Sequence, residues 1–437
     1  MTNCIPISYQ FSRIKNRKIE INFSGGEISS DGGLLLLREA DRKLRLTSSL
    51  AELFPDKRNP DRIRHSTLTM LKQRIYGIAL GYEDLNDHDK LRKCSALQTA
   101  SERLEDMASS ATLCRFENGV DRNFIIEAHK VIIDKFIESF RDTPKELVLD
   151  FDATDDEVHG HQEGRFYHGY YRHNCFLPLY VFCNKKLLVS YLRTSEQDQA
   201  KHSWAILALL VKRFRRQWPE VEIVFRGDSG FCRHRMLDWC DKHGIKYIIG
   251  QAQNSRLNKL LEPTMEQAKR EYQTTKTKQR YFTEFLYKAG SWSHERKIVG
   301  KAEVTGLGEN PRYVVTNIEG KPADLYEKLY CERGNMENRI KEQQLELFAD
   351  RTSCHKWWPN QFRMILSSLA YTLVEYIRDK FLQGTELAMA QVGTIRLKLF
   401  KIGAIIIRNT RRVMFLLSSS YPYRHLWDSI MKKLALE

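Results

Sequence analysis

The sequence predicts an α/β protein that carries a β-rich insertion and is flanked by helical regions at both ends. Three observations carry this prediction. Short apolar strand patterns alternate with amphipathic helix patterns between about residues 145 and 250. Strand patterns separated by glycine-containing turns follow at 281–317. Before and after these stretches, apolar residues recur at helical spacing.

Each element of the α/β part follows from its residue pattern. Short apolar runs bounded by turn residues indicate buried strands, and apolar residues spaced three and four apart indicate helices. The polar, lysine-rich stretch 251–280 indicates a solvated helix, and 324–348 a long polar helix. The remaining expected elements are strands at 147–152, 178–183, 187–192, 221–225 and 245–249, and helices at 199–218 and 232–243.

The two ends of the chain are expected to be mainly helical. After a short strand at 19–23, helices are predicted at 34–46, 67–80 and 84–91 and an amphipathic helix at 124–140. Gly81 separates two of these helices, a layout that is compatible with a helix-turn-helix but that any helical hairpin also shows. The tail from Gln391 onward is basic and is expected to contain more helix.

Composition narrows the class of partner and compartment. A net charge of +15 and a pI near 9.3 favour a polyanion, usually nucleic acid, over the alternative of an ordinary basic globular protein. The nine cysteines form no Cys-x-x-Cys pair, which argues against a disulfide framework and a structural zinc site and favours a reducing cytoplasm. No apolar run reaches the length of a membrane helix, so a soluble intracellular protein is expected.

Acidic residues fall where strands are predicted to end. Asp150 and Asp152 lie two apart on one strand and share a face, and Asp228 follows another strand. Open α/β sheets bind ligands at the carboxyl ends of strands, so these acids can converge there. Oxygen ligands favour Mg²⁺ or Mn²⁺, which would offset the repulsion between the carboxylates. Each Asp taken alone is also compatible with a cap or turn residue.

A late helix presents a third acid together with two cations. Tyr330, Arg333 and Glu337 are spaced three and four apart and share one helical face, and Lys341 lies one turn further along. Such a stripe can hold a metal ion and grip phosphate. A solvated face with ordinary ion pairs is the alternative.

These motifs together resemble the DDE transposases of bacterial insertion sequences. They are Asp-Ala-Thr at 152–154, Arg-Gly-Asp-Ser-Gly-Phe at 226–231 and Tyr-x-x-Arg-x-x-x-Glu at 330–337. The run Leu-Asp-Phe-Asp-Ala-Thr-Asp-Asp-Glu-Val-His-Gly-His-Gln, which begins at Leu149, and the pair Pro178-Leu179 are similar to the insertion sequence thirteen-eighty group. The likeness spans most of the chain, and its motifs are specific as a set but weak one by one.

The resemblance implies an RNase H-like mixed sheet with helices on both faces, interrupted by the β-rich insertion. It implies that Asp152, Asp228 and Glu337 are the catalytic and metal-binding residues. Asp150 competes with Asp152, and the Asp-x-Thr pattern favours Asp152. The implied cofactor is Mg²⁺, with Mn²⁺ as a substitute and two ions in each active site.

The resemblance also implies contacts with DNA. Tyr330 and Arg333 match the family's contacts with the DNA end. Related transposases often place a Lys seven residues after the Glu, where this chain has Gln344, so Lys341 is the candidate substitute. Trp292 is a candidate to stack on a flipped base, or else a buried aromatic residue of the insertion.

Further basic residues outside the motif are candidate phosphate contacts. Arg165 and Arg172 lie in a stretch rich in aromatic and histidine residues, for which a zinc site is the less favoured alternative. In the tail, Arg411 and Arg412 are expected to hold phosphates, unless they belong to a solvated basic face.

The predicted activity is phosphoryl transfer on DNA. Two metal ions about 3.5–4 Å apart would activate water to cut the ends of a mobile element, and the 3′-hydroxyl would then attack target DNA. The expected partners are the terminal inverted repeats, target DNA and a second copy of the chain, because two ends must be paired. A bacterial, nucleoid-associated protein is expected. The alternatives are an RNase H-like nuclease without strand transfer and an inactive DNA-binding protein.

The expected domain organisation has five parts. The predicted ranges are a mainly helical DNA-binding region at 1–143, the first part of the catalytic core at 144–252, the β-rich insertion at 253–321, the second part of the core with the Glu helix at 322–382, and a basic helical region at 383–437.

Overall fold

The structure, a computed structural model, describes residues 8–436. The chain forms two compact units. The first contains the residues up to Gly119 and from Leu373 onward, and the second contains Val120–Thr372. No helix in the described part of the chain is long and apolar enough to cross a membrane. The five-part division made from the sequence stays a prediction.

The second unit is built on a mixed sheet. The parallel strands β4, β10 and β11 form its centre, and the other pairings are antiparallel. The mixed α/β class predicted from the sequence is therefore confirmed. In spatial order the strands are β12 (Gln279–Tyr287), β13 (Arg296–Thr305), β15 (Arg312–Thr316), β11 (Lys246–Gln251), β10 (Glu222–Gly227), β4 (Glu146–Ala153), β8 (Leu179–Cys183) and β9 (Lys186–Tyr191), with β14 (Gly308–Glu309) paired to β13.

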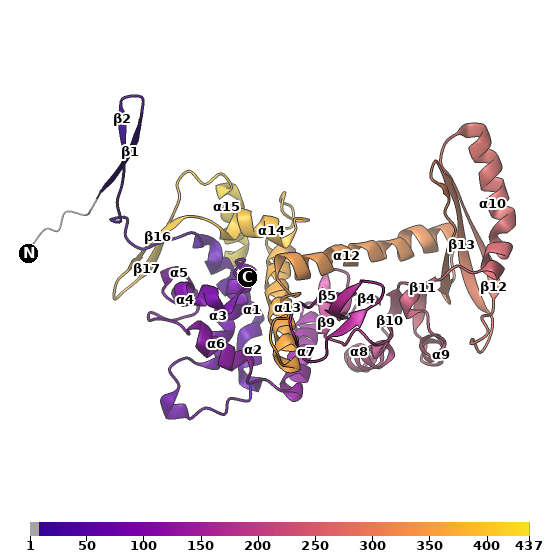
Figure 1. The fold of residues 1–437 in the computed structure, drawn as a ribbon, viewed down its shortest axis with the longest axis horizontal. Coiled ribbons are helices and arrows are strands. Elements are labelled where there is room, and N and C mark those ends of the chain that lie inside the picture. The colour runs from indigo at the N-terminus through magenta and orange to yellow at the C-terminus, as the bar shows by residue number, and fades with distance from the viewer. Residues whose placement is uncertain (1–7, 437) are drawn as a thin grey trace, which may run out of the picture. The chain divides into compact units, whose positions relative to one another are not determined.

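Alternation along the strands gives the sheet one large apolar face. On β4, the side chains of Leu147, Leu149 and Phe151 lie in the main core, whereas Asp150 and Asp152 point to the opposite face. Helices contribute apolar residues to this core and cover this face (Figure 1). They are α7 (Arg122–Glu138), α8 (Ser203–Gln217), α9 (His234–Lys242) and α10 (Ser255–Thr275).

The opposite face is covered by later segments of the chain. Leu325 and Tyr326 pack on Ile248 and Val314 of the sheet. Tyr371 of α13 (Trp357–Lys380) meets Phe182 of β8 edge to face, with ring centroids 5.9 Å apart. Helix α12 (Gly334–Lys341) runs on the side of the sheet away from α8 and α9 (Figure 1). Helices therefore lie on both faces, and the Glu-bearing helix lies on the face to which the two aspartates point.

The strands predicted for the insertion are present and continue the central sheet. Strand β15 pairs with β11, and β13 and β12 follow outward. Helix α10 packs on them through Leu257, Leu261 and Met265. A separate small sheet with the order β5-β7-β6 follows β4 and comprises β5 (Asp156–Glu157), β6 (Phe166–His168) and β7 (His173–Phe176).

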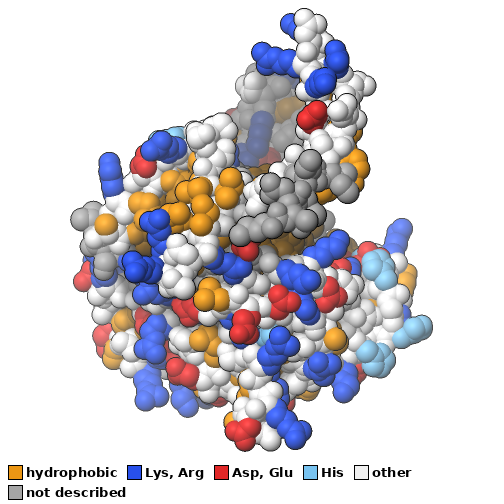
Figure 2. Space-filling model, turned by 90° about the vertical axis from the view of Figure 1, so that its left-hand side faces the viewer, with side chains coloured by type: hydrophobic (Ala, Val, Ile, Leu, Met, Phe, Trp, Pro, Cys, Tyr) orange, Lys and Arg blue, Asp and Glu red, His pale blue; other side chains and the backbone are white. Residues whose placement is uncertain are grey.

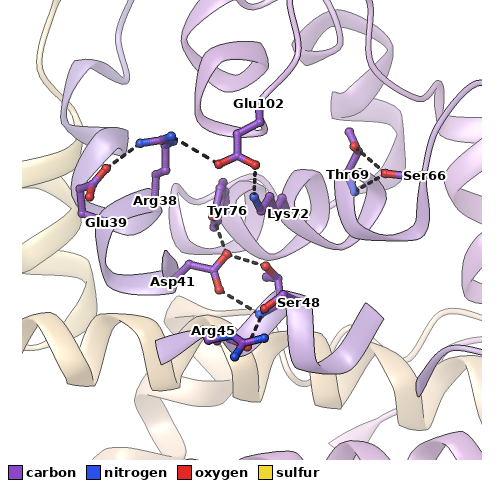
Figure 3. A network of polar contacts seen from close by, with 11 residues as sticks. Arg38, Glu39, Asp41, Arg45, Ser48, Ser66, Thr69, Lys72, Tyr76 and Glu102 are labelled. Carbon is purple, nitrogen blue, oxygen red and sulfur yellow. Dashed lines mark hydrogen bonds and ion pairs between the residues drawn. The ribbon is translucent and has the colours of Figure 1, made fainter. Parts of the chain in front are cut away.

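The first unit is mainly helical, and polar contacts are embedded in its apolar interior. Tyr76 of α3 donates a hydrogen bond of 2.7 Å to Asp41, and Lys72 pairs with Glu102 at 2.9 Å (Figure 3). Because nearly all of α3 is buried, its side chains cannot read a DNA groove. Its helices are α1 (Leu35–Leu44), α2 (Leu46–Leu53), α3 (Thr67–Ala79), α4 (His88–Leu91), α5 (Ser95–Ala100), α6 (Ser110–Glu117), α14 (Val392–Ile395) and α15 (Arg424–Leu436).

Three features of the first unit differ from the sequence-based expectation. The helix expected at 84–91 forms as a 3-10 turn at Leu85–Asp87 followed by the four-residue α4, which is shorter than expected, and the helix-turn-helix interpretation stays a prediction. A hairpin of β1 (Tyr9–Ile14) and β2 (Arg17–Ile21) forms at the start. The tail is not purely helical: β16 (Ala404–Arg408) pairs with β17 (Val413–Leu417) and with β3 (Ile28–Ser29). Three consecutive isoleucines at 405–407 favour a strand because they are β-branched.

Candidate active site

Asp150 is the innermost acid on the polar face of β4. Its carboxylate accepts two hydrogen bonds from Arg226 on the neighbouring strand β10, one of them 2.7 Å long. Both side chains are almost fully buried, and Arg226 also donates to the carbonyl oxygen of Leu329 at 2.5 Å. Burial raises the pKa of Asp150, and Arg226 acts in the opposite direction. Asp150 is therefore committed to an internal ion pair that braces the sheet against the segment before α12.

Asp152, two residues further along β4, lies where that strand reaches its carboxyl end. One carboxylate oxygen accepts from the amide of Ala153 at 2.9 Å, and the other accepts from Arg333 at 2.9 Å. Burial, together with the nearby carboxylates of Asp228 and Glu337, raises the pKa of Asp152 to about 7 in spite of Arg333. A buried acid in such surroundings needs a cationic partner in order to ionise.

Asp228 follows the last residue of β10 and caps the short turn Ser229–Phe231. Its carboxylate accepts from the amide of Gly230 at 2.9 Å and from the side-chain amide of Gln199 at 3.2 and 3.4 Å. These donors fix the orientation of the carboxylate. A side chain at Gly230 would collide with Gln199, so the loop packs tightly here.

Glycine at position 250 lets the elements of the site approach one another. A Cβ built on Gly250 of β11 would lie 2.6 Å from the hydroxyl oxygen of Tyr330 and 2.8 Å from the amide nitrogen of Ser229. Tyr330 therefore reaches the loop that carries Asp228. Burial raises the pKa of Tyr330, and the Asp228 carboxylate is one of the charges that act on it.

Glu337 lies on α12, and Arg333 one turn earlier links it to the sheet. The guanidinium of Arg333 donates to Glu337 at 2.7 Å and to Asp152 at 2.9 Å. The Glu337 side chain is about half exposed (49%), whereas that of Arg333 is 18% exposed. Wider π-helical turns at Leu325–Tyr330 and Glu342–Glu346 lie on either side of α12, a feature that is frequent at functional sites.

The three acids therefore approach one region from three elements. Asp152 ends a strand, Asp228 follows the neighbouring strand, and Glu337 comes from the helix that crosses the same face. The site has the donors that a divalent cation needs, namely carboxylates, one of them buried with a raised pKa. The Arg333 guanidinium occupies the position between Asp152 and Glu337 and supplies positive charge there.

A second acidic cluster lies elsewhere in the second unit. Among residues 8–436, one group of three acidic, histidine or cysteine side chains has its ligand atoms within 4.8 Å of one another, and it consists of Asp238, Asp241 and His294. Arg296 forms ion pairs with both aspartates, so their charge is already balanced. The predicted triad is more widely spaced than this cluster, because Arg333 lies between two of its members.

The family model described as transposase DDE domain group 1 matches residues 11–437. The chain belongs to the DDE transposase family. It is accordingly an enzyme that cuts and transfers DNA, and DDE transposases use divalent metal ions.

A cryo-EM structure of a piggyBac transposase synaptic complex with hairpin DNA resembles this transposase with a TM-score of 0.44 and 10% sequence identity, over 93% of this chain and 85% of that chain. No curated protein matches the chain significantly.

Gln344, which stands where related transposases often have a Lys, forms hydrogen bonds inside this transposase. Gln344 turns inward and donates hydrogen bonds to the carbonyl oxygen of Asp155 at 2.9 Å and to the carboxylate of Asp156 at 2.8 Å. Asp156 is fully buried, and burial raises its pKa. The neutral amide of Gln344 donates to both of these acceptors. A Lys at this position would place a charged ammonium group in the same surroundings. Lys341 is exposed on α12, so its role as the substitute stays a prediction.

The small sheet after β4 carries the predicted residues Arg165 and Arg172. His173 of β7 bonds Asp155 at 2.8 Å, which ties this sheet to the end of β4. Tyr171 stacks on His173 with a centroid distance of 6.0 Å. Arg172 is exposed at the turn between β6 and β7, and Arg165 bonds His161 at 2.8 Å. No zinc-like group of histidines is found here among the residues that the structure describes.

Three predicted DNA contacts, Trp292, Arg411 and Arg412, lie on elements that carry none of the three acids. Trp292 is 6% exposed and packs edge to face on Tyr287, so the structure places it in the core of the extended sheet. In this position its indole is not available to a base. Arg411 and Arg412 are exposed in the first unit, at the turn between β16 and β17, where both amides donate to Asn409 at 3.0 Å. The DNA contacts of all three stay predictions.

Two residues of the site were missed by the sequence analysis. Gln199 holds Asp228, and it lies on the loop that precedes α8. Arg193, 2% exposed, fixes this loop by donating to the carbonyl oxygens of Gln199 at 2.7 Å and Lys201 at 2.8 Å. No motif marks either residue. The available signal was an arginine at the end of an apolar strand, which must find acceptors when it is buried.

Proposed function

We propose that Asp152, Asp228 and Glu337 are the catalytic carboxylates of this transposase and hold two Mg²⁺ ions, for which Mn²⁺ can substitute. The observation that carries the proposal is the position of Arg333, which bonds acids from two different elements at 2.9 and 2.7 Å. The third acid, Asp228, lies near enough to contribute to the raised pKa of Asp152.

The divalent ions, when bound, supply activated water and stabilise the charge that develops on the phosphate. The residues of the chain prepare the site for this chemistry. Gly230 and Gln199 orient Asp228, and the Asp150–Arg226 pair braces β4 and β10. Arg333 neutralises Asp152 and Glu337 in the metal-free protein. With divalent ions held by Asp152 and Glu337, the Arg333 guanidinium would be available to bind a phosphate of the DNA end.

The substrate side of the proposal uses the predicted basic and aromatic residues. Tyr330 and Arg333, with Lys341 beyond them, contact the DNA end next to the acids. The other predicted contacts are Arg165 and Arg172 on the small sheet, Trp292 in the extended sheet, and Arg411 and Arg412 in the first unit. A stacking role for Trp292 requires that the indole leave its buried position.

We further propose that the transposase acts on the terminal inverted repeats of a bacterial insertion sequence of the thirteen-eighty group. It would work as a homodimer that pairs two ends, in the cytoplasm on the nucleoid. The proposed catalytic fold is RNase H-like, because β4, β10 and β11 run parallel between the antiparallel strands β8 and β15.

A strand-transfer assay tests the proposal against its alternatives. A labelled duplex that carries the element's end is incubated with Mn²⁺, the full chain and a supercoiled target plasmid. Cleavage followed by joining of the label to the plasmid is expected. Cleavage without joining would favour an RNase H-like nuclease, and binding without cleavage an inactive DNA-binding protein.

A further inference from the structure

The hairpin β1–β2 has one apolar face and one polar face. The cross-strand pairs Tyr9–Ile21 and Phe11–Ile19 lie on one side, and the pair Gln10–Glu20 lies on the other. Such alternation is typical of a strand pair that packs its apolar side on a core. Here the exposed fractions are 53% for Tyr9, 61% for Phe11 and 49% for Ile21. The apolar face of the hairpin therefore lacks a core.

The hairpin also lacks support from a larger sheet. Each of its strands pairs with the other alone. A lone two-stranded hairpin is at best marginally stable in water and needs packing against a further surface. In this chain the hairpin projects from the first unit (Figure 1). A stable hairpin therefore requires a surface that packs against Tyr9 and Phe11.

A second apolar surface without a partner lies on the same unit. In the sheet β17-β16-β3, Ile405 is paired with Leu416 on one side and Ile28 on the other, so the three side chains share a face. Their exposed fractions are 44%, 48% and 65%, and Ile407 on the same face is 42% exposed. Figure 2 shows hydrophobic side chains gathered on this side of the molecule.

The sequence of β16 indicates that both of its faces should be covered. The run Ala404-Ile405-Ile406-Ile407 is apolar throughout, which is typical of strands buried on both faces. Ala404 and Ile406 are buried against the unit, so the inner face is filled. The outer face carries side chains suited to a core and lacks the second layer.

We propose that the β1–β2 hairpin of one copy packs its apolar face on the outer face of the β3–β16–β17 sheet of a second copy. The exchange is reciprocal, so one two-fold axis creates two equal contacts. Within one chain the connection 22–27 leads the hairpin away from its own sheet, with Gly26 at a φ of +76° in the turn. Within residues 8–436 both apolar faces thus stay exposed, and they match one another across the pair.

The exposed area is sufficient for a stable dimer. The contact joins Tyr9, Phe11, Ile19 and Ile21 of the hairpin to Ile28, Ile405, Ile407 and Leu416 of the sheet. If each of these eight side chains buries about 80 Å², one contact buries roughly 650 Å² and two bury roughly 1,300 Å², within the range of specific interfaces. The cations of the hairpin tip, Arg13, Lys15, Arg17 and Lys18, remain in water beyond the contact.

Cysteine pairing between two differently tagged full-length chains tests the exchange. Cys4, Cys114 and Cys331 are replaced by Ser in both chains. One chain carries Phe11→Cys and the other carries Leu416→Cys. Oxidation is expected to give a disulfide-linked heterodimer. The matched control is Gln10→Cys, which lies one residue away on the polar face and is expected to cross-link far less. Equal cross-linking of both positions, or none at Phe11, would overturn the proposal.

The mass in solution provides a second and independent readout. The wild-type chain is expected to be a dimer without DNA, and Phe11→Ser and Ile405→Ser are expected to give monomers that keep the wild-type helix content by circular dichroism. A monomeric wild type would overturn the proposal. It would do so also if Phe11→Ser lowered the affinity for DNA while the chain kept the mass of a dimer, because the hairpin would then contact DNA and not a second copy. Neither result bears on the catalytic acids.

Discussion

Two clusters of acidic side chains in the second unit each surround one arginine, and they differ in how firmly that arginine is held. Arg296 pairs with Asp238 and Asp241, and its guanidinium lies over the rings of Tyr247 and Trp292 at 5.8 and 5.9 Å. Its side chain is 2% exposed. Arg333 lies between Asp152 and Glu337 and is 18% exposed.

This difference is the reason why we propose the metal site at the cluster whose ligand atoms are more widely spaced. The cluster around Arg296 brings its ligand atoms within 4.8 Å of one another, yet a buried arginine already balances the charge of its two aspartates. The cluster around Arg333 is more open, and its arginine bridges a buried acid and a half-exposed one on a separate helix. We expect a counter-charge in that position to be exchanged for metal ions more readily than the buried Arg296.

The largest expected effect separates the two clusters by activity. Asp228→Asn removes a proposed metal ligand and should lower Mn²⁺-dependent cleavage at least about 10³-fold, with binding of the DNA end retained. Asp238→Asn is the matched control in the other cluster and should leave the rate within about twofold. A gel assay of end cleavage with both variants measures this. Retained cleavage in Asp228→Asn would contradict the assignment.

The second prediction compares the two arginines by stability. Arg296→Met leaves two aspartates and the hydroxyl of Tyr247 without their buried donor, so the free energy of unfolding should fall by about 3 kcal/mol. Arg333→Met should cost about 1 kcal/mol or less, because Glu337 is half exposed and Asp152 can take up a proton. Urea unfolding in a chelator measures both. Equal losses of unfolding free energy in the two variants would show that Arg333 contributes as much to the stability of the fold as Arg296 does.

The third prediction concerns pH in the absence of metal. The pKa of Asp152 is about 7 in the folded chain, against an ordinary value of 3.8, so the folded state binds the proton more tightly than the unfolded state. This group therefore stabilises the fold at acid pH, and the contribution is lost as the pH rises through about 7. Asp152→Asn should be more stable than the wild type by about 2 kcal/mol at pH 8 and nearly equal at pH 4. A constant difference at both pH values would contradict the raised pKa.

The fourth prediction uses metal affinity. Removal of a competing guanidinium should tighten the binding of Mn²⁺, so Arg333→Met should lower the Kd by about tenfold, or about 1.4 kcal/mol. Arg296→Met should leave the Kd unchanged if it remains folded. Titration calorimetry without DNA gives both constants. Weaker binding in Arg333→Met would mean that the guanidinium organises the acids and does not compete with the metal.

The smallest expected effect concerns Gln199, which holds Asp228 in place. Gln199→Leu should raise the Kd for Mn²⁺ by up to about tenfold, because an unsupported carboxylate binds less well. Gln197→Leu, two residues earlier in the same loop, should leave the Kd unchanged. A fall in melting temperature without a change in Kd would assign Gln199 to the fold alone.

Much of the central fold could be predicted because its signals are local. The alternation in Leu147–Asp152 specifies a strand with one apolar and one acidic face, and β4 shows this division. The spacing of Arg333 and Glu337 specifies one helical face, and the two side chains form an ion pair. Periodicity along the chain therefore predicts which face of a strand or helix carries the acids. It does not predict which other segment packs against that face.

The remaining features depend on contacts between distant segments. The pairing of Asp150 with Arg226, and of Gln344 with Asp156, decides which polar residue is structural, and neither pair is close in sequence. From the sequence, Trp292 is equally compatible with a buried and an exposed position. Its contacts with Tyr287 and Arg296, which only the structure shows, place it in the core. The strand β16 was predicted as helix because its partners, β3 and β17, were not recognised as strands.

Iron-directed cleavage of the polypeptide tests the central claim most directly. The metal-free transposase is loaded with Fe²⁺, and ascorbate with peroxide generates radicals that cut the backbone beside the bound ion. Convergence of the three acids predicts cuts near Asp152, Asp228 and Glu337, all of which are lost in Asp228→Asn. Cuts confined to the region of Asp238 and His294, or a pattern that omits the segment around Glu337, would contradict it.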